Sequence, residues 1–370
     1  MGRAKARGPR LSVARACLWS SRGWCIRRGG SSIICLSNYS AFEVVFHRRS
    51  LLFVVGANFL SVPLMIAESL SDLIGGTPLL ALNSFAPEHR ILAKCEFMNP
   101  ISIKDRPVRE IIAQAEARGE LKPGDTIIEA TSGNTGMALA SIGNRCGYRV
   151  LIVMSEIQSL ERRMIMKALG AELILTPAEE GTKGAKAKLD EICAKHPDYF
   201  YLGQHHNKDN SAAHYAGTGP EIWEATEGQV DLFVAALGTG GTITGVGTYL
   251  KEKNPTLQCV AIEPEQAPFI SQGRFSPHRI MGSAPGFVPA VLEREVIDAF
   301  ELISEEEAFA ACRELAEKEG VLVGITSGAN AAVARRLACC PENQGKTIVC
   351  IFCDTGQRYL SVEGLFTDSV

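Results

Sequence analysis

The sequence predicts an α/β fold made of two interwoven α/β domains with mainly parallel sheets. Apolar runs of strand length alternate with amphipathic runs of helix length, and the same rhythm returns in the second half of the chain. With 46% hydrophobic and 21% charged residues, 370 residues are enough to bury one large core or two smaller ones. Repeated strand–loop–helix units indicate parallel strands with helices on both faces. Ligands of such folds bind at the carboxyl ends of the strands.

The expected elements follow in chain order. The first block pairs strands with helices: TIIEA (126–130) with MALASIGNRCG (137–147), YRVLIVMS (148–155) with SLERRMIMKALG (159–170), and AELILTP (171–177) with GAKAKLDEICAKH (184–196). The rhythm returns in DLFVAAL (231–237), TGVGTYLKEK (244–253) and QCVAIEP (258–264). Ser304 and Glu307 match a capping box that opens a helix ending at Gly320, after which VLVGITSGAN (321–330) resumes the pattern. We expect two domains facing a cleft.

The first 67 residues differ in composition from the rest. They carry ten Lys or Arg against one acid, Glu43, a local charge of +9 that leaves −12 for residues 68–370. This composition is typical of an organellar transit peptide, with an untranslated or unstructured extension as the alternative. The apolar run 51–66 is shorter than the roughly 20 residues that a membrane helix needs. We therefore expect no stable membrane insertion and a fold that begins near Ser69.

Charge and cysteine usage narrow the class of ligand. An acidic body disfavours nonspecific nucleic-acid binding, which depends on basic patches. Three of the twelve cysteines lie in residues 1–67, and the CIFC pair Cys350 and Cys353 lies in an apolar run of strand length. With no second CxxC and no nearby histidine pair, we expect no metal site and interpret these thiols as buried core residues. A reducing compartment and a small-molecule partner fit best.

Four segments supply candidate chemistry. Lys104 lies in NPISIKDRP (99–107), just before a helix-like stretch. A lysine can form a Schiff base with an aldehyde only where its site lowers the pKa of its amine. The alternative is a solvated surface lysine, which is what most lysines are. TSGNTG (131–136) follows a strand and offers hydroxyls, an amide and backbone N–H groups, although such residues are also ordinary in turns. GTGGT (238–242) reads as a phosphate loop or a tight turn and lacks the P-loop sequence. In TSGAN (326–330), Ser327 is a ligand-facing hydroxyl or a helix N-cap.

Taken together, these segments resemble fold-type II pyridoxal phosphate enzymes, in particular the cysteine synthase (O-acetylserine sulfhydrylase) and cystathionine β-synthase family. The resemblance runs from about Ser71 (SDLIGGTPLLAL) to about Phe366, with the motifs in the family's order. It implies a tryptophan synthase β-like fold with pyridoxal 5'-phosphate in the cleft between the domains. On this reading, residues 69–97 and 209–366 form the larger cofactor-binding domain, and residues 98–208 form a smaller mobile domain.

The resemblance also implies residue roles. Lys104 is expected to carry the cofactor and to act as the catalytic base, and Ser327 to face the ring nitrogen, where a neutral hydroxyl favours elimination at Cβ. The phosphate loop corresponds to Gly238, Thr239, Gly240, Gly241 and Thr242. The substrate α-carboxylate is expected to bind Thr131, Ser132, Gly133, Asn134, Thr135 and Gln204, with Asn134 also reaching the ring oxygen of the cofactor. His205 and His206 are adjacent on an extended segment and point to opposite sides, so no chelating pair is expected; His214 reads as helix packing or capping.

Two segments depart from the family pattern. SEIQSLERR (155–163) stands where PETMSLERR is common, and GSAPGF (282–287) where GIGAGF is common. Because the second loop borders the cleft in relatives, reaction type is predicted more firmly than substrate preference.

The expected reaction is β-replacement, giving L-cysteine and acetate from O-acetyl-L-serine and sulfide. The alternatives at the same site are cystathionine β-synthase, O-phosphoserine sulfhydrylase, and serine or threonine dehydratase activity. A further alternative is a weakly catalytic relative that binds the C-terminal tail of serine acetyltransferase. The resemblance implies a homodimer. The location is expected to be cytoplasmic, or mitochondrial or plastid if the leader is a transit peptide.

Overall fold

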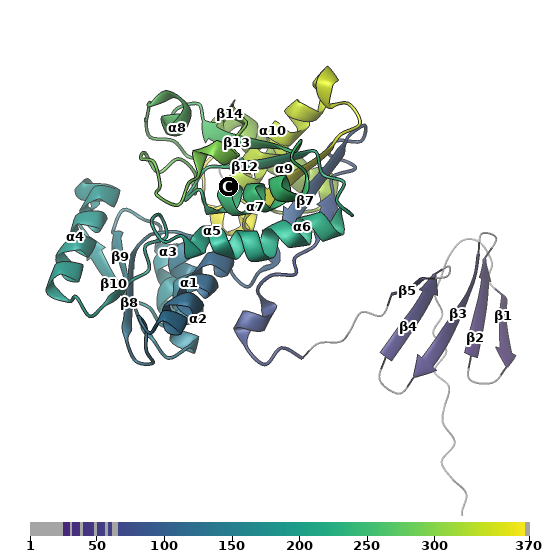
Figure 1. Ribbon diagram of the computed structural model, residues 1–370, viewed down its shortest axis with the longest axis horizontal. Helices are drawn as coiled ribbons and strands as arrows, with labels where there is room; N and C mark the ends of the chain where they lie inside the picture. The colour runs from purple at the N-terminus through teal and green to yellow at the C-terminus, as the bar shows by residue number, and fades with distance from the viewer. Residues whose placement is uncertain are drawn as a thin grey trace, which may run out of the picture. The chain divides into compact units, whose positions relative to one another are not determined.

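The computed structural model describes residues 25–29, 32–37, 40–47, 50–55, 58–60 and 66–366 (Figure 1). The chain divides into two compact units, Met1–Ala67 and Glu68–Val370. The described strands of the first unit form an antiparallel sheet of order β1-β2-β3-β4-β5; they are β1 (Cys25–Gly29), β2 (Ser32–Ser37), β3 (Ser40–His47), β4 (Ser50–Val55) and β5 (Asn58–Leu60). Most of the predicted leader lies outside the described residues, and within the described part no helix is both long and apolar enough to cross a bilayer.

The second unit contains a four-stranded, fully parallel sheet of order β10-β9-β8-β11. Its strands are β8 (Thr126–Ala130), β9 (Arg149–Ser155), β10 (Glu172–Thr176) and β11 (Phe200–Tyr201). In β9 every residue after Arg149 is buried, as expected for a strand covered on both faces. Helix α4 (Gly181–Lys195) packs on one face, and the other is covered by α1 (Asp105–Arg118), α2 (Asn134–Arg145) and α3 (Leu160–Ala168) (Figure 1).

A six-stranded sheet of order β14-β13-β12-β15-β7-β6 forms the rest of this unit, parallel except for the edge strand β6. Its strands are β6 (Leu79–Ala81), β7 (Arg90–Cys95), β12 (Leu232–Ala236), β13 (Gln258–Pro264), β14 (Ala299–Ile303) and β15 (Thr347–Phe352). One face packs against α9 (Glu305–Glu319) and α10 (Ile325–Ala338), and the other against α6 (Gly219–Ala225) and α7 (Gly241–Lys253). The predicted α/β class with mainly parallel sheets is confirmed.

Short helices connect these elements. They are α5 (Asp209–Ala213), α8 (Phe269–Gln272), a π-helical turn (His214–Thr218) and 3₁₀ turns at Leu70–Leu73, Glu96–Met98, Ala178–Glu180, Arg294–Val296, Pro341–Asn343 and Gly356–Tyr359.

Two local predictions can be scored. The capping box is confirmed, because Ser304 and Glu307 exchange both hydrogen bonds at the start of α9. The resumed strand after Gly320 is wrong: only five residues separate α9 from α10, and they form a single bridge, between Val323 and Thr355.

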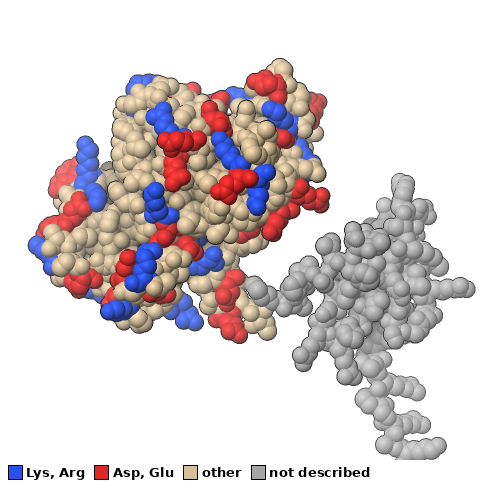
Figure 2. Space-filling model, in the orientation of Figure 1, with Lys and Arg blue, Asp and Glu red and all other residues tan. Residues whose placement is uncertain are grey.

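Charged side chains of both signs are interspersed over the face of residues 66–366 that Figure 2 shows. No single-sign patch dominates that face. This face therefore offers no continuous basic patch of the kind that binds a polyanion.

Candidate active site

Three parallel strands end at two adjoining cavities, which we call the outer and the inner cavity. Strand β8 leads into residues 131–135, β12 into residues 238–242, and β15 into Cys353 and Asp354. The outer cavity has a volume of about 410 Å³, and the inner cavity adjoins it at the glycine loop. Seven residues line both cavities: Lys104, Asn134, Gly238, Thr239, Met281, Gly282 and Tyr359. The site therefore lies where the carboxyl ends of parallel strands converge.

Lys104 is the only lysine among the described residues that lines these two cavities. It directly precedes α1, which begins at Asp105. Burial lowers the pKa of its amine below 10.5, and the nearby Cys353 and Asp354 offset part of that effect. A lowered pKa increases the fraction of free amine, the form that can attack an aldehyde or take up a proton.

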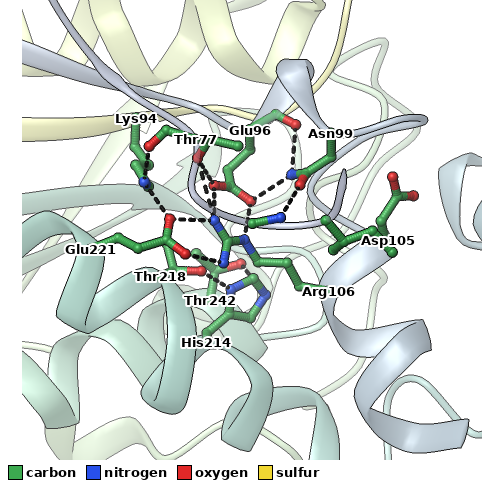
Figure 3. A network of polar contacts seen from close by, with 12 residues as sticks. Thr77, Lys94, Glu96, Asn99, Asp105, Arg106, His214, Thr218, Glu221 and Thr242 are labelled. Atoms are coloured by element: carbon green, nitrogen blue, oxygen red, sulfur yellow. Dashed lines mark hydrogen bonds and ion pairs between the residues drawn. The ribbon is translucent and has the colours of Figure 1, made fainter. Parts of the chain in front are cut away.

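A buried network of charges fixes the helix that follows Lys104 (Figure 3). The Arg106 guanidinium pairs with Glu96 (Nε to Oε2, 2.6 Å) and with Glu221 (Nη2 to Oε2, 2.6 Å), and Lys94 also pairs with Glu221 at 2.6 Å. Two cations and two anions thus balance within the network. Burial by itself raises the pKa of Glu221, but the bonds and charges of Arg106 and Lys94 outweigh it and lower that pKa to about 2. Helix α1 is thereby tied to the turn after β7 and to α6.

The residues of the glycine loop turn from β12 into α7. Gly240 is in the left-handed conformation, with φ of 83°, and a Cβ on Gly238 would overlap the carbonyl oxygen of Gly282. The first turn of α7 directs backbone N–H groups that have no partner within the helix toward the loop, an arrangement that suits an anion. Asn210 supports the loop by donating to Thr239 Oγ1 at 3.0 Å and to the Gln204 carbonyl at 2.7 Å.

The predicted substrate-binding residues all line the outer cavity; they are Thr131, Ser132, Gly133, Asn134, Thr135 and Gln204. The predicted turn is partly helical, because Asn134 is the first residue of α2. Thr135 Oγ1 donates to Gln204 Oε1 at 2.5 Å, and Gln204 N donates to the buried carboxylate of Glu129 at 3.1 Å. The loop after β8 and the segment after β11 therefore form one polar wall.

Ser327 is completely buried and is the third residue of α10; it lines neither cavity, although its neighbour Thr326 lines the inner one. Its reading as an N-cap is wrong, because Gly324 occupies that position. The backbone N–H of Cys353 donates to its hydroxyl at 2.9 Å.

Several cavity residues were not predicted from the motifs. Asp354, Arg358 and Tyr359 follow β15, and Arg162 lies on α3. The position of Asp354 in the sequence could have identified it as a site residue. It follows the apolar run TIVCIFC, at the carboxyl end of a buried parallel strand. Cys350 is buried as expected, whereas Cys353 lines the inner cavity.

The two segments that depart from the family pattern, 155–163 and 282–287, also border the outer cavity. Gly282, Ser283 and Pro285 of GSAPGF and Gln158 of SEIQ contribute to its wall. His205 lines the same cavity, and burial lowers its pKa to about 4, so its imidazole is neutral near pH 7. His214 is buried between Thr218 and Thr242, with ring nitrogens 2.9 and 3.3 Å from their hydroxyls.

The residues present fit a ligand that carries both an aldehyde and a phosphate. A buried amine with a lowered pKa lines the same inner cavity as a glycine loop and a helix N-terminus. At Gly238 a Cβ would fill the space of that close turn. The site thus offers an amine for the aldehyde and N–H donors for the phosphate.

Comparisons with known proteins agree with this geometry. Residues 70–354 match the family model described as pyridoxal-phosphate dependent enzyme. Cysteine synthase A of Escherichia coli K12 is 46% identical over 313 residues, which cover 82% of this chain and 96% of that protein.

Solved structures give the same result. O-acetyl serine sulfhydrylase isoform 3 from Entamoeba histolytica superposes with a TM-score of 0.79 at 43% identity, covering 83% of this chain and 93% of that one. An O-ureido-L-serine synthase superposes with a TM-score of 0.79 at 42% identity, covering 83% and 97%. The chain belongs to the family of pyridoxal-phosphate dependent enzymes.

Proposed function

We propose that this protein is a cysteine synthase that makes L-cysteine and acetate from O-acetyl-L-serine and sulfide. The observation that carries the proposal is the placement of Lys104 in one cavity with the glycine loop and the hydroxyl-rich loop after β8. Relatives that are more than 40% identical to this chain over the aligned residues are named as cysteine synthase or O-acetyl serine sulfhydrylase, which supports the same activity. In the reaction the Cβ–O bond breaks, acetate leaves with its electron pair, and a sulfide forms the new Cβ–S bond.

Each predicted residue has a defined task in this proposal. Lys104 holds the aldehyde of pyridoxal phosphate, and the loop Gly238–Thr242 holds its phosphate. The ring nitrogen is assigned to Ser327, whose hydroxyl is bonded to the N–H of Cys353 in the wall of the inner cavity. When bound, the cofactor supplies an electron-withdrawing ring that stabilises the loss of the Cα proton. The Lys104 amine, whose pKa is lowered by burial, removes that proton and returns it to Cα after the Cβ–S bond has formed.

The substrate is oriented by the polar wall of the outer cavity. Thr131, Ser132, Gly133, Asn134 and Thr135 belong to the first turn of α2 and the loop before it, where an anionic carboxylate is favourable. Gln204, held by Thr135 and Glu129, completes this subsite. Fixing the carboxylate fixes the direction of the Cα–H bond toward the base.

The test is product analysis with purified enzyme. O-acetylserine with sulfide should give cysteine and acetate in equal amounts, whereas the other pairs should turn over at least about a hundredfold more slowly, a difference of about 2.7 kcal/mol in transition-state binding. The alternative substrates are serine with homocysteine, O-phosphoserine with sulfide, and serine or threonine without a second substrate. Faster turnover of any of them would replace the proposed substrate, and activity equal to that of Lys104→Ala would exclude catalysis at this site.

A further inference from the structure

The amide of Asn134 is held at both ends by residues that no sequence motif predicted. Its Nδ2 donates to Asp354 Oδ2 at 2.7 Å, and its Oδ1 accepts from Arg358 Nη1 at 3.0 Å. Asp354 is 2% exposed, and its Oδ2 also accepts from the Tyr359 hydroxyl at 2.5 Å. All four residues line the outer or the inner cavity.

We propose that Asp354 and Arg358 are positioning residues that fix the orientation of the Asn134 amide for its contacts with cofactor and substrate. The inference rests on the proposed function and adds two residues to its machinery. Neither residue touches the reacting atoms in this account. Asp354 acts through Asn134, and Arg358 acts through Asn134 and through the carbonyl of Ile101.

The chemistry of the two partners allows only one amide orientation. A guanidinium only donates hydrogen bonds, and a carboxylate only accepts them. A flipped amide would place its NH₂ against Arg358 and its oxygen against Asp354, losing both bonds and creating two repulsive contacts. In the observed orientation, one of the two N–H groups on Nδ2 donates to Asp354. The second N–H group is left to donate to a ligand.

The contacts also join segments that are distant in the sequence. Asn134 opens α2 next to the four-stranded sheet, whereas Asp354 and Arg358 follow β15 of the six-stranded sheet. Arg358 Nη2 donates in addition to the carbonyl of Ile101 at 2.6 Å, three residues before Lys104. One guanidinium thus sets the substrate loop and the lysine segment relative to each other. Because the Asp354 carboxylate is buried, the hydrogen bonds that it accepts from Asn134 and Tyr359 are stronger than they would be in water.

The experiment is a double-mutant cycle in the full-length protein. The dissociation constant of pyridoxal phosphate and the KM and kcat for O-acetylserine are measured for Asp354→Val, Arg358→Met, Asn134→Ala and the paired variants. Asp354→Asn keeps an acceptor oxygen for Asn134 and Tyr359 and serves as the conservative rescue. Arg313→Met is the matched control, since Arg313 bonds two backbone carbonyls, of Gly364 and Leu365, outside both cavities.

We expect Asp354→Val and Arg358→Met each to weaken cofactor binding about tenfold, as for the loss of a hydrogen bond to a charged group. Asp354→Asn should weaken it less than threefold. In the Asn134→Ala background, Asp354→Val should add less than twofold. Arg358→Met should add less than its full effect in the native background, because only its bond to the carbonyl of Ile101 is then left to lose. The absorbance band of the bound cofactor should shift in Asp354→Val but not in Arg313→Met.

Full tenfold effects in the Asn134→Ala background would overturn the inference, and so would the absence of an effect in the native background. If Asp354→Val does not fold, as judged by thermal unfolding, the Arg358→Met cycle carries the same test. Failure of the proposed function is distinguishable, because it would appear as a wild-type protein that binds no cofactor at Lys104.

Discussion

The backbone N–H of Cys353 donates to the Ser327 hydroxyl at 2.9 Å, and the carbonyl of the same Cys353 accepts from the N–H of Ile103 at 2.9 Å. One residue at the end of β15 therefore joins the start of α10 to the segment that carries Lys104. A hydroxyl that accepts from an N–H keeps its own proton to donate, which suits an unprotonated ring nitrogen.

Replacing Ser327 by Ala should destabilise the protein even without cofactor. The Cys353 N–H would lose its partner, at a cost of about 1–3 kcal/mol in the free energy of unfolding. Denaturant unfolding of protein freed of cofactor measures this change. A loss of activity with unchanged unfolding would show instead that the hydroxyl acts only on the ligand.

The Thr135–Gln204 hydrogen bond should matter for substrate binding more than for turnover. Thr135→Val keeps the side-chain shape but removes the donor to Gln204 Oε1. We expect the KM for O-acetylserine to rise about tenfold, equivalent to about 1.4 kcal/mol, with kcat within about threefold. Steady-state kinetics test this, and an equal fall in kcat with unchanged KM would contradict it.

The buried network around Arg106 should dominate the stability of α1. Arg106→Met leaves Glu96, which is fully buried, without its cation, so we expect a loss of about 3–5 kcal/mol. Arg118→Met on the same helix is the matched control, because its pairs with Glu120 and Asp209 involve an Arg118 side chain that is 41% exposed. Chemical denaturation of both variants compares them; similar losses would argue against a special role for the network.

Acid should weaken the same network through Glu221. Its pKa is lowered from 4.5 to about 2 in the folded protein, so its contribution is fully present above pH 4.5 and is lost as the pH falls toward 2. A shift of this size corresponds to at most about 3 kcal/mol, and solvent screening of the partly exposed carboxylate reduces that figure. Unfolding free energies measured between pH 5 and pH 2 should fall more steeply for wild type than for Glu221→Gln, and parallel slopes would refute the assignment.

Much of the fold was predictable because parallel strands covered on both faces leave uninterrupted apolar runs, as in β9 and β15. The main site segments were predictable because each follows such a run and carries residues with unusual backbone or chemical demands. Lys104, the glycine loop and the loop after β8 do line one cavity. The strand expected within 321–330 failed because a short apolar run does not reveal whether a neighbouring strand is within reach.

The contacts that hold the site were not predictable in the same way. Asn134 and Asp354 are 220 positions apart, and Arg106 and Glu221 are 115 apart. No local pattern marks such pairs, since an isolated Asp or Arg in a sequence is most simply read as a solvated residue. Only the packing of the two sheets brings them together.

The most direct test of the account is the identity of the lysine that binds the cofactor. The purified protein, supplied with pyridoxal phosphate, is reduced with borohydride, digested, and analysed by mass spectrometry alongside its visible absorbance before and after reduction. The account predicts a coloured protein whose band disappears on reduction and whose single modified peptide carries the pyridoxyl group on Lys104. A protein that stays colourless with added cofactor, or one modified at another lysine, would contradict it.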